Sequence, residues 1–234
     1  MPDTSAPRIR DGLYAAVPIM LGYFPIAFSF GVAASRAGFS VAETAFMSLV
    51  IYSGAAQFLA LALVASGAPV LVAGGTLIAM GLRHLLYGPA LMKEAGPTAR
   101  RRFAAIWGWG LTDEVFGQAI GSLSREGKFS EGWIFGIGLG AYATWVAGSI
   151  IGAWAGGGVL DAWPAVSAGL SFMLAALFLS ILMSIASRKS LPVIAVATVA
   201  TVLGSVLLSP TSGILAGMIA GALTGVVLPQ EDRA

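Results

Sequence analysis

Four ionisable side chains lie deep inside long apolar segments of this sequence, in two neighbouring pairs. Arg83 and His84 interrupt one apolar segment, and Asp113 and Glu114 lie near the centre of the next one. A charge in the middle of a bilayer is costly in free energy unless it faces a partner, water or the interior of a helix bundle. These four residues are therefore the first candidates for substrate binding and proton coupling.

The spacing of Arg83 and Asp113 permits an ion pair between them. Their two segments share the loop after Leu91, so depth can be counted from that loop along both. At about 1.5 Å per residue, the two residues lie about 12 and 15 Å deep, which suits a charge-assisted contact. If Arg83 neutralises one of the two acids, the second is available to bind a substrate ammonium group or to carry a proton. The alternative is that the pair only holds two helices together.

Two further residues belong to the same stretch of chain. An imidazole with its ordinary pKa exchanges protons near cellular pH. His84 could therefore relay a proton, or it could be a hydrogen-bonded structural residue. Tyr87 follows Arg83 by one helical turn and shares its face, so we expect it to line the same cavity.

Small and polar residues interrupt the apolar segment 41–65 at its centre, which predicts a break in the helix there. A helix that restarts near Gly54 would direct free backbone N–H groups and a positive dipole end to mid-membrane, where a carboxylate could bind. Ser53 and Gln57 add side-chain donors, although they could equally bond to neighbouring helices. The predicted substrate-binding residues are Ser53, Gly54, Gln57, Arg83, Tyr87, Asp113 and Glu114, with Asp113, Glu114 and His84 predicted to couple protons.

The composition places these residues in a membrane protein. Of 234 residues, 57% are hydrophobic and 10% are charged, whereas soluble domains carry about 25% charged residues. No strand-like alternation of polar and apolar residues is present, which favours helices over a barrel. The apolar segments are 13–34, 41–65, 69–91, 103–123, 132–155, 162–186, 191–208 and 212–228.

The positions of the charges constrain how these segments cross the membrane. Eight full crossings from a cytoplasmic N-terminus would place the basic loop 93–102 outside, against the tendency of Lys and Arg to remain in the cytoplasm. If the second and sixth segments are broken or re-entrant, that loop returns to the cytoplasm together with Arg188 and Lys189. Arg36, Arg125 and Lys128 would then lie outside.

We therefore predict an all-α polytopic membrane protein with about six full crossings and two broken or re-entrant segments, up to eight helical segments in all. The whole chain would form one transmembrane domain, with both termini in the cytoplasm. The halves 1–127 and 128–234 would form an inverted repeat, as in many transporters. Continuous tilted helices are the alternative.

Several other classes of function are disfavoured. The chain has no Cys and one His, so it cannot form a disulfide or a cluster of Cys and His metal ligands, and we expect no cofactor. Its basic residues lie in loops, which argues against nucleic-acid binding. An enzyme with Ser53 or Ser122 as nucleophile and His84 as base lacks a supporting motif. A channel is the main alternative, although the absence of Asn removes the Asn-Pro-Ala caps of aquaporins.

Four motifs in this sequence, in this order, resemble the AzlC family of bacterial membrane proteins. The resemblance extends from about Gly12 to Arg188. The chain departs from the family pattern at Gly81, where that pattern often has Asn, and this removes one polar group beside the predicted site. The motifs are LGYFPIAF at 21–28, YSGAAQF at 52–58, LRHLLYG at 82–88 and LTDE at 111–114.

The resemblance implies a function that the residues by themselves do not specify. AzlC proteins are the large subunits of branched-chain amino-acid exporters and act with a small membrane partner, AzlD. By resemblance, we expect export of leucine, isoleucine, valine or a similar amino acid across the bacterial inner membrane, driven by protons. The predicted site suits such a substrate, because it offers groups for a carboxylate and for an ammonium.

Overall fold

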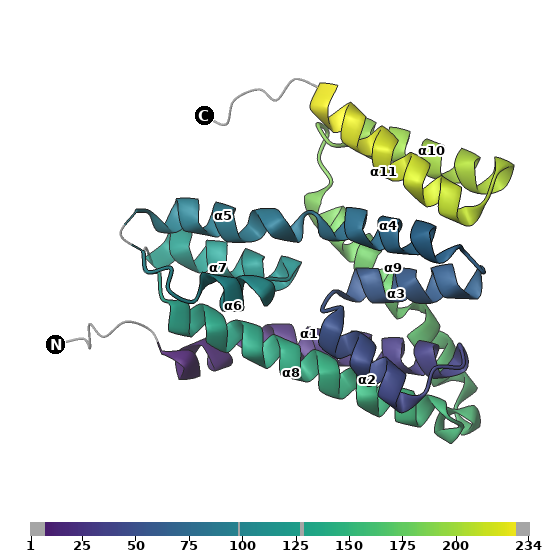
Figure 1. The fold of residues 1–234 in the computed structure, drawn as a ribbon, viewed down its shortest axis with the longest axis horizontal. Helices are drawn as coiled ribbons and strands as arrows, with labels where there is room; N and C mark the ends of the chain where they lie inside the picture. The colour runs from purple at the N-terminus through teal and green to yellow at the C-terminus, as the bar shows by residue number, and fades with distance from the viewer. Residues whose placement is uncertain (1–7, 98, 127–128, 228–234) are drawn as a thin grey trace. The chain divides into compact units, whose positions relative to one another are not determined.

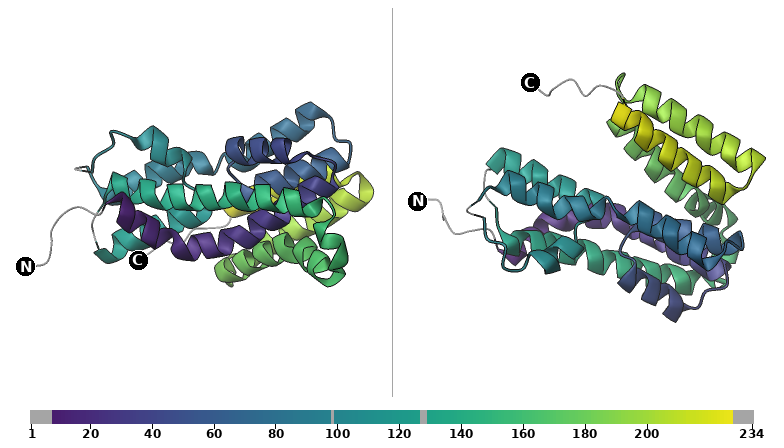
Figure 2. Two further views of the ribbon diagram at one scale, coloured as in Figure 1. Left: turned by 90° about the horizontal axis from the view of Figure 1, so that it is seen from below. Right: turned by 45° about the horizontal axis from the view of Figure 1, so that its top comes forward.

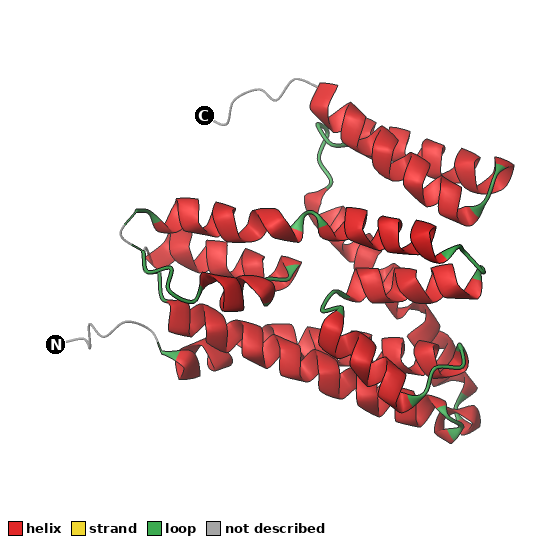
Figure 3. Ribbon diagram, viewed as in Figure 1, coloured by secondary structure: helices red, strands yellow, loops and turns green. Residues whose placement is uncertain are grey.

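The computed structural model describes residues 8–97, 99–126 and 129–227, and these residues form helices joined by loops without a strand (Figures 1 and 3). The expected all-α fold is confirmed. Among the described residues, three helical stretches are long and apolar enough to cross a membrane: 9–36, 70–95 and 131–156. The helices are α1 (Ile9–Arg36), α2 (Val41–Val50), α3 (Gly54–Ala65), α4 (Val70–Gly81), α5 (His84–Ala95), α6 (Ala104–Trp109), α7 (Asp113–Glu126), α8 (Glu131–Gly156), η1 (Val159–Ala162), α9 (Pro164–Ile185), α10 (Leu191–Leu207) and α11 (Pro210–Val227).

The chain divides into two compact units, which we describe separately. The first contains residues 1–65 and 73–174, and the second contains residues 66–72 and 175–234. In the second unit, glycines allow α10 and α11 to pack closely. A Cβ atom added to Gly213 would lie 2.0 Å from the Ser205 hydroxyl, and one added to Gly217 would lie 1.9 Å from the Thr201 hydroxyl. Gly213 and Gly217 therefore allow α11 to pack directly on the backbone and hydroxyl groups of α10.

The helices α1 and α8 pack against each other along their full lengths through glycines (Figures 1 and 2). A Cβ atom added to Gly12 would lie 2.0 Å from the Trp133 carbonyl oxygen, and one added to Gly31 would lie 2.1 Å from the Ser149 carbonyl oxygen. Residue numbers increase together along the contact, so the two helices run in the same direction. Backbones approach this closely in membranes only where side chains are small.

The second apolar segment enters and leaves on the side where α1 ends. Ser40 caps the start of α2 and exchanges hydrogen bonds with Glu43. The helix ends at Val50, and α3 starts at Gly54 and turns back, so that its Leu61 packs against Phe30 and Ala34 in the last part of α1. The expected break in this segment is confirmed.

The third segment crosses in the opposite direction to α1, with an interruption at its centre. Here α4 ends at Gly81 and α5 begins at His84, a break that the sequence analysis did not predict. The first turns of α5 pack beside the start of α7 through the stacked rings of Tyr87 and Phe116, 4.6 Å apart. The segment therefore ends at Ala95 on the side where α1 begins, which we call the N-terminal side.

The fourth segment is re-entrant, which corrects the prediction of a full crossing. Trp107 in α6 bonds to Glu131 at the start of α8, whereas Gly110 lies against Gly138, further along α8. After this break α7 runs back to Glu126, close in sequence to the start of α8. The physical reason is local: glycines flank Trp109, and the two acids that follow favour the first turn of a new helix.

The sixth segment also differs from the prediction, because α9 is one uninterrupted helix from Pro164 to Ile185. The predicted halves 1–127 and 128–234 remain a prediction. The parallel course of α1 and α8 nevertheless differs from the opposite directions that such halves require. Within the first unit, a span followed by a re-entrant pair occurs twice in opposite directions, once in residues 9–65 and once in 73–126.

Re-entry of the fourth segment changes the distribution of charge. Arg125 was expected on the side opposite the N-terminus, but the last turn of α7 returns it to the N-terminal side. Lys128 lies outside the described residues. At the far side, α1 ends with Arg36. The basic residues of the first unit that lie on the N-terminal side are Arg8, Arg10, Lys93, Arg100, Arg101, Arg102 and Arg125.

The contact between α1 and α8 predicts a large effect of one methyl group. We expect Gly31→Ala to lower the free energy of unfolding by about 3 kcal/mol or more, because the new atom meets backbone that cannot move aside. Gly22→Ala is the control, because its Cβ would meet no described atom within 4 Å. Thermal unfolding of both variants in detergent measures the difference, and equal stability would contradict the contact.

The two re-entrant segments predict the sidedness of three loops. The chain has no Cys, so single substitutions can be labelled without background. We expect Ala99→Cys and Glu126→Cys to react with an impermeant maleimide from one side of the membrane and Ala37→Cys to react from the other. Labelling of position 126 from the same side as position 37 would show that the fourth segment crosses.

Candidate functional site

Three helix interruptions converge near the centre of the first unit. They lie at 51–53, 82–83 and 110–112, and the middles of α1 and α8 pack beside them. Tyr23 of α1 contacts Thr112, and Tyr142 of α8 contacts the end of α2. Interrupted backbone at membrane depth requires such partners, because lipid offers no hydrogen bonds.

The predicted ion pair between Arg83 and Asp113 is present. The guanidinium Nη2 lies 2.8 Å from Asp113 Oδ2, and the Tyr87 hydroxyl donates a hydrogen bond to Oδ1 of the same carboxylate. Arg83 lies just before α5 and Asp113 begins α7, so the pair joins two helix breaks. The side chains of Arg83 and Asp113 are 43% and 39% exposed. The ion pair therefore holds two helices together and is also accessible to a ligand.

Glu114 is held by a different group. The Tyr23 hydroxyl donates to Glu114 Oε2 at 2.5 Å and lies 2.6 Å from the Thr112 hydroxyl. Thr112 also accepts a hydrogen bond from the backbone of Val115, so it caps α7. Within the described part of the chain, Glu114 belongs to no ion pair. One of the two neighbouring acids is thus neutralised and the other is not.

Gln57 has a structural role in the arrangement observed. Its side chain is fully buried, and its amide oxygen accepts a hydrogen bond from the Trp145 indole at 2.7 Å. Its amide nitrogen donates to the Ser48 hydroxyl at 3.1 Å. A Cβ atom added to Gly54 would lie 2.5 Å from the Trp145 ring, so the start of α3 also packs on α8. In the structure Gln57 therefore bonds to neighbouring helices, which was the alternative to substrate binding.

The remaining predicted residues occupy two places. Ser53 is half-buried at the break before α3, where its backbone N–H donates to the Ile51 carbonyl at 2.7 Å. His84 Nδ1 lies 3.2 Å from the Gly81 carbonyl oxygen, and its ring lies 5.3 Å from the Tyr87 ring. The structure therefore brings Arg83, Tyr87, Asp113 and Glu114 together, with His84 beside them.

An aromatic cluster that sequence reasoning missed lies at the break between α2 and α3. Tyr52, Trp109 and Tyr142 contact one another, with ring centroids 4.9 to 5.7 Å apart. The Tyr142 hydroxyl donates to the Leu49 carbonyl at 3.0 Å, which satisfies a group left free where α2 ends. The sequence did contain a signal for this cluster: Tyr52, like Tyr23, is an aromatic residue with a polar atom in the middle of an apolar segment.

A cavity of about 390 Å³ adjoins this cluster, between α5 and α6. The Tyr52 hydroxyl is buried and has no hydrogen-bond partner among the described residues. His84, one of the predicted residues, is also in the wall, so the cavity borders the ion-pair site. Its walls include Tyr52, His84, Gly88, Ala104, Gly108 and Trp109.

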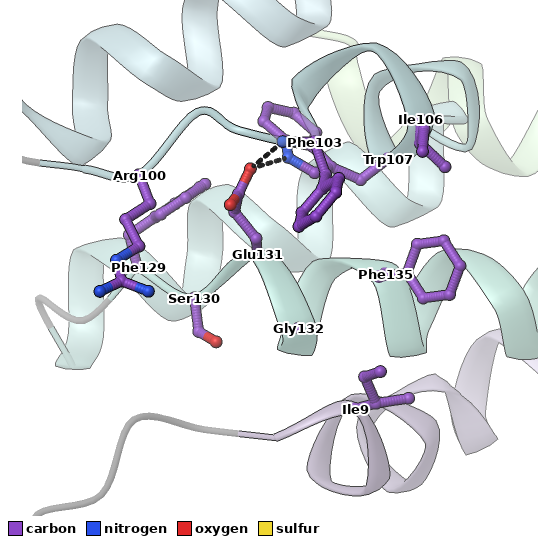
Figure 4. A pocket seen from close by; sticks show the side chains of 10 residues that line it. All are labelled: Ile9, Arg100, Phe103, Ile106, Trp107, Phe129, Ser130, Glu131, Gly132 and Phe135. Carbon is purple, nitrogen blue, oxygen red and sulfur yellow. Dashed lines mark hydrogen bonds between the residues drawn. The ribbon is translucent and has the colours of Figure 1, made fainter.

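A separate groove lies where α6 meets the start of α8 (Figure 4). Glu131 Oε1 accepts hydrogen bonds from the Phe103 backbone N–H at 2.9 Å and from the Trp107 indole at 3.0 Å. These bonds fix the short helix α6 onto α8. Because this carboxylate oxygen is already used within the chain, the groove is a weaker candidate for a ligand than the cavity beside Tyr52.

Fold and site define a multi-pass helical membrane protein with a charged, aromatic-lined centre. The chain belongs to the AzlC family, whose model, described as AzlC protein, matches residues 18–159. The family predicted from the four motifs is thus confirmed.

Two similar relatives cover almost the whole chain. It is 40% identical over 227 residues to the inner membrane protein YgaZ of Escherichia coli, covering 97% of this chain and 93% of that protein. It is 36% identical over 223 residues to an uncharacterized membrane protein of Archaeoglobus fulgidus, covering 95% and 94%.

A third relative carries a functional name. The branched-chain amino acid transport protein AzlC of Bacillus subtilis is 25% identical over 173 residues, covering 74% of this chain and 65% of that protein. No solved structure matches this chain.

The ion pair predicts a specific order of stabilities. We expect Arg83→Gln and Asp113→Asn each to destabilise the protein, because each leaves the other charge without its partner at membrane depth. The double variant should be more stable than the sum of the two single effects predicts. Thermal unfolding of the four proteins in detergent measures the coupling, and additive effects would show that the two side chains do not interact.

Proposed function

We propose that this chain is a secondary transporter that exports branched-chain or similar amino acids across the bacterial cytoplasmic membrane, coupled to protons. The name of the Bacillus subtilis relative supports an amino-acid substrate. The observation that carries the proposal is the pair of adjacent acids at a helix break, of which only Asp113 has an arginine partner. Nothing in this arrangement requires a catalytic role.

Each group in the centre has a part in this proposal. Glu114, held by Tyr23, binds the substrate ammonium or carries the coupled proton, because its charge has no cationic partner within the described residues. Arg83 exchanges its bond with Asp113 for one with the substrate carboxylate. The start of α3 at Ser53 and Gly54 adds backbone N–H groups, and His84 is the second candidate for proton transfer.

The charge distribution supports an orientation for the transporter. The N-terminal side of the first unit carries seven of the basic residues named above, and α1 ends with Arg36 on the other side. Lys and Arg concentrate on the cytoplasmic side of membrane proteins. We therefore place the N-terminus and the loop 93–102 in the cytoplasm. The C-terminus is proposed to lie there too.

A small AzlD-like membrane subunit is part of the proposal, and it rests on the family. Efflux measured with this chain alone and with this chain plus such a subunit shows whether the subunit is required.

A channel is the second candidate, because two re-entrant segments that enter from opposite sides also suit a pore. Saturable, proton-dependent flux favours the transporter, and unsaturable flux that continues after the proton gradient has collapsed favours the channel.

The central prediction concerns amino-acid efflux from preloaded cells. We expect wild type with its partner to export leucine, an uncoupler to abolish export, and Glu114→Gln to reduce it to the level of empty cells. Glu94→Gln removes an exposed carboxylate at the end of α5 and should leave efflux unchanged. Full efflux by Glu114→Gln, with the variant present in the membrane at wild-type levels, would remove Glu114 from the mechanism.

A further inference from the structure

The cavity between α5 and α6 has a lining of mostly small and apolar residues. Its volume of about 390 Å³ falls in the range of small-molecule sites, about 300 to 1,000 Å³. Gly88, Ala104 and Gly108 are small wall residues, whereas His84 and Trp109 are large ones. Small walls leave room that the chain itself does not fill.

Tyr52 contributes its ring to the wall of this cavity. The residue is 8% exposed, and the rings of Trp109 and Tyr142, at 5.7 and 4.9 Å, hold the side chain in place. Its hydroxyl is buried away from the open space and forms no hydrogen bond with any described residue. The surface that Tyr52 presents to the cavity is therefore aromatic.

The cavity adjoins the charged centre through two neighbours. His84 lines the cavity and directly follows Arg83 in the chain. Its ring lies 5.3 Å from the Tyr87 ring, and Tyr87 in turn bonds to Asp113. A ligand with its charged groups at Arg83 and Glu114 could therefore extend an uncharged side chain past His84 into this cavity.

The two wall glycines differ from those that pack against backbone. A Cβ atom added to Gly88 or Gly108 would meet no described atom within 4 Å, whereas one added to Gly31 would lie 2.1 Å from a carbonyl oxygen. Larger residues at Gly88 and Gly108 therefore fit the fold and take up space at the cavity wall. In an apolar pocket, one methylene changes discrimination by about 10- to 200-fold.

We propose that this cavity receives the aliphatic side chain of the transported amino acid and that Gly108 and Gly88 limit the size of that side chain. This inference rests on the proposed function, because it assigns the specificity pocket of the same transporter. The substrate class follows from the lining: apart from His84, Tyr52 and the Trp109 indole, the wall residues carry no polar side chain.

Competition between amino acids of graded size tests the pocket. Cells that carry this chain and its partner subunit are loaded with labelled alanine, valine and leucine, and efflux is compared for wild type, Gly108→Ala and Gly108→Val. We expect Gly108→Val to lower the ratio of leucine to alanine efflux by about 10-fold or more, and Gly108→Ala to lower it less. Gly88→Ala should act in the same direction.

Gly22→Val is the matched control, since Gly22 is an exposed helical glycine whose added Cβ meets no described atom within 4 Å. It should leave the ratio unchanged. Size-exclusion profiles in detergent show whether each variant is folded. If Gly108→Val does not fold, Gly108→Ala and Gly88→Ala are used for the comparison instead.

The outcomes separate this inference from the proposed function. If wild type exports amino acids and folded variants at Gly108 and Gly88 keep the wild-type ratio, the cavity is not the specificity pocket, and the export function stands. If wild type exports none of the three amino acids, the proposed function and the pocket both fail. A size-dependent loss at Gly108 that is absent at Gly22 supports both.

Discussion

The close contact between α1 and α8 is the interaction on which the centre of this protein depends. Glycines let the two parallel helices approach along their length, which brings Tyr23, Tyr142 and Trp145 to similar depths. These three side chains bond to Glu114, Leu49 and Gln57, which lie at or beside helix breaks. In a bilayer, interrupted helices persist only where the protein itself supplies such partners. Without this frame, the breaks would expose unpaired backbone to lipid.

The breaks in turn explain why the charges lie where they do. Asp113 and Glu114 occupy the first turn of α7, where the helix dipole stabilises negative charge. Arg83 lies in the interruption before α5 and bonds to one of them. A full helix across the membrane would have to bury both acids in its middle. The re-entrant geometry instead offers one neutralised and one unneutralised acid, which is the asymmetry that a proton-coupled carrier needs.

Much of this site was predictable from ionisable residues, because these are costly in free energy inside a bilayer. Ionisable residues inside apolar segments indicated Arg83 and Asp113, and counting residues from the shared loop predicted their pairing. The break at Ser53 and Gly54 was equally visible. The break at 110–112 was missed because Gly110 and Thr112 interrupt an otherwise apolar run only weakly. The partners of Gln57 and Glu114 were missed because they lie some 90 residues away along the chain, beyond the reach of any local pattern.

A cross-link between α5 and α7 tests the re-entrant centre most directly. The stacked rings of Tyr87 and Phe116 have centroids 4.6 Å apart, so these two positions are neighbours. In membranes that contain the Tyr87→Cys, Phe116→Cys protein, mild oxidation or a short thiol cross-linker should form an intramolecular link that is detected by a mobility shift. A continuous fourth helix would instead place residue 116 about 20 Å from the loop that precedes it and leave residue 87 about 12 Å deep, beyond the reach of such a link. Failure to form the link, with the folded protein present, would contradict the account.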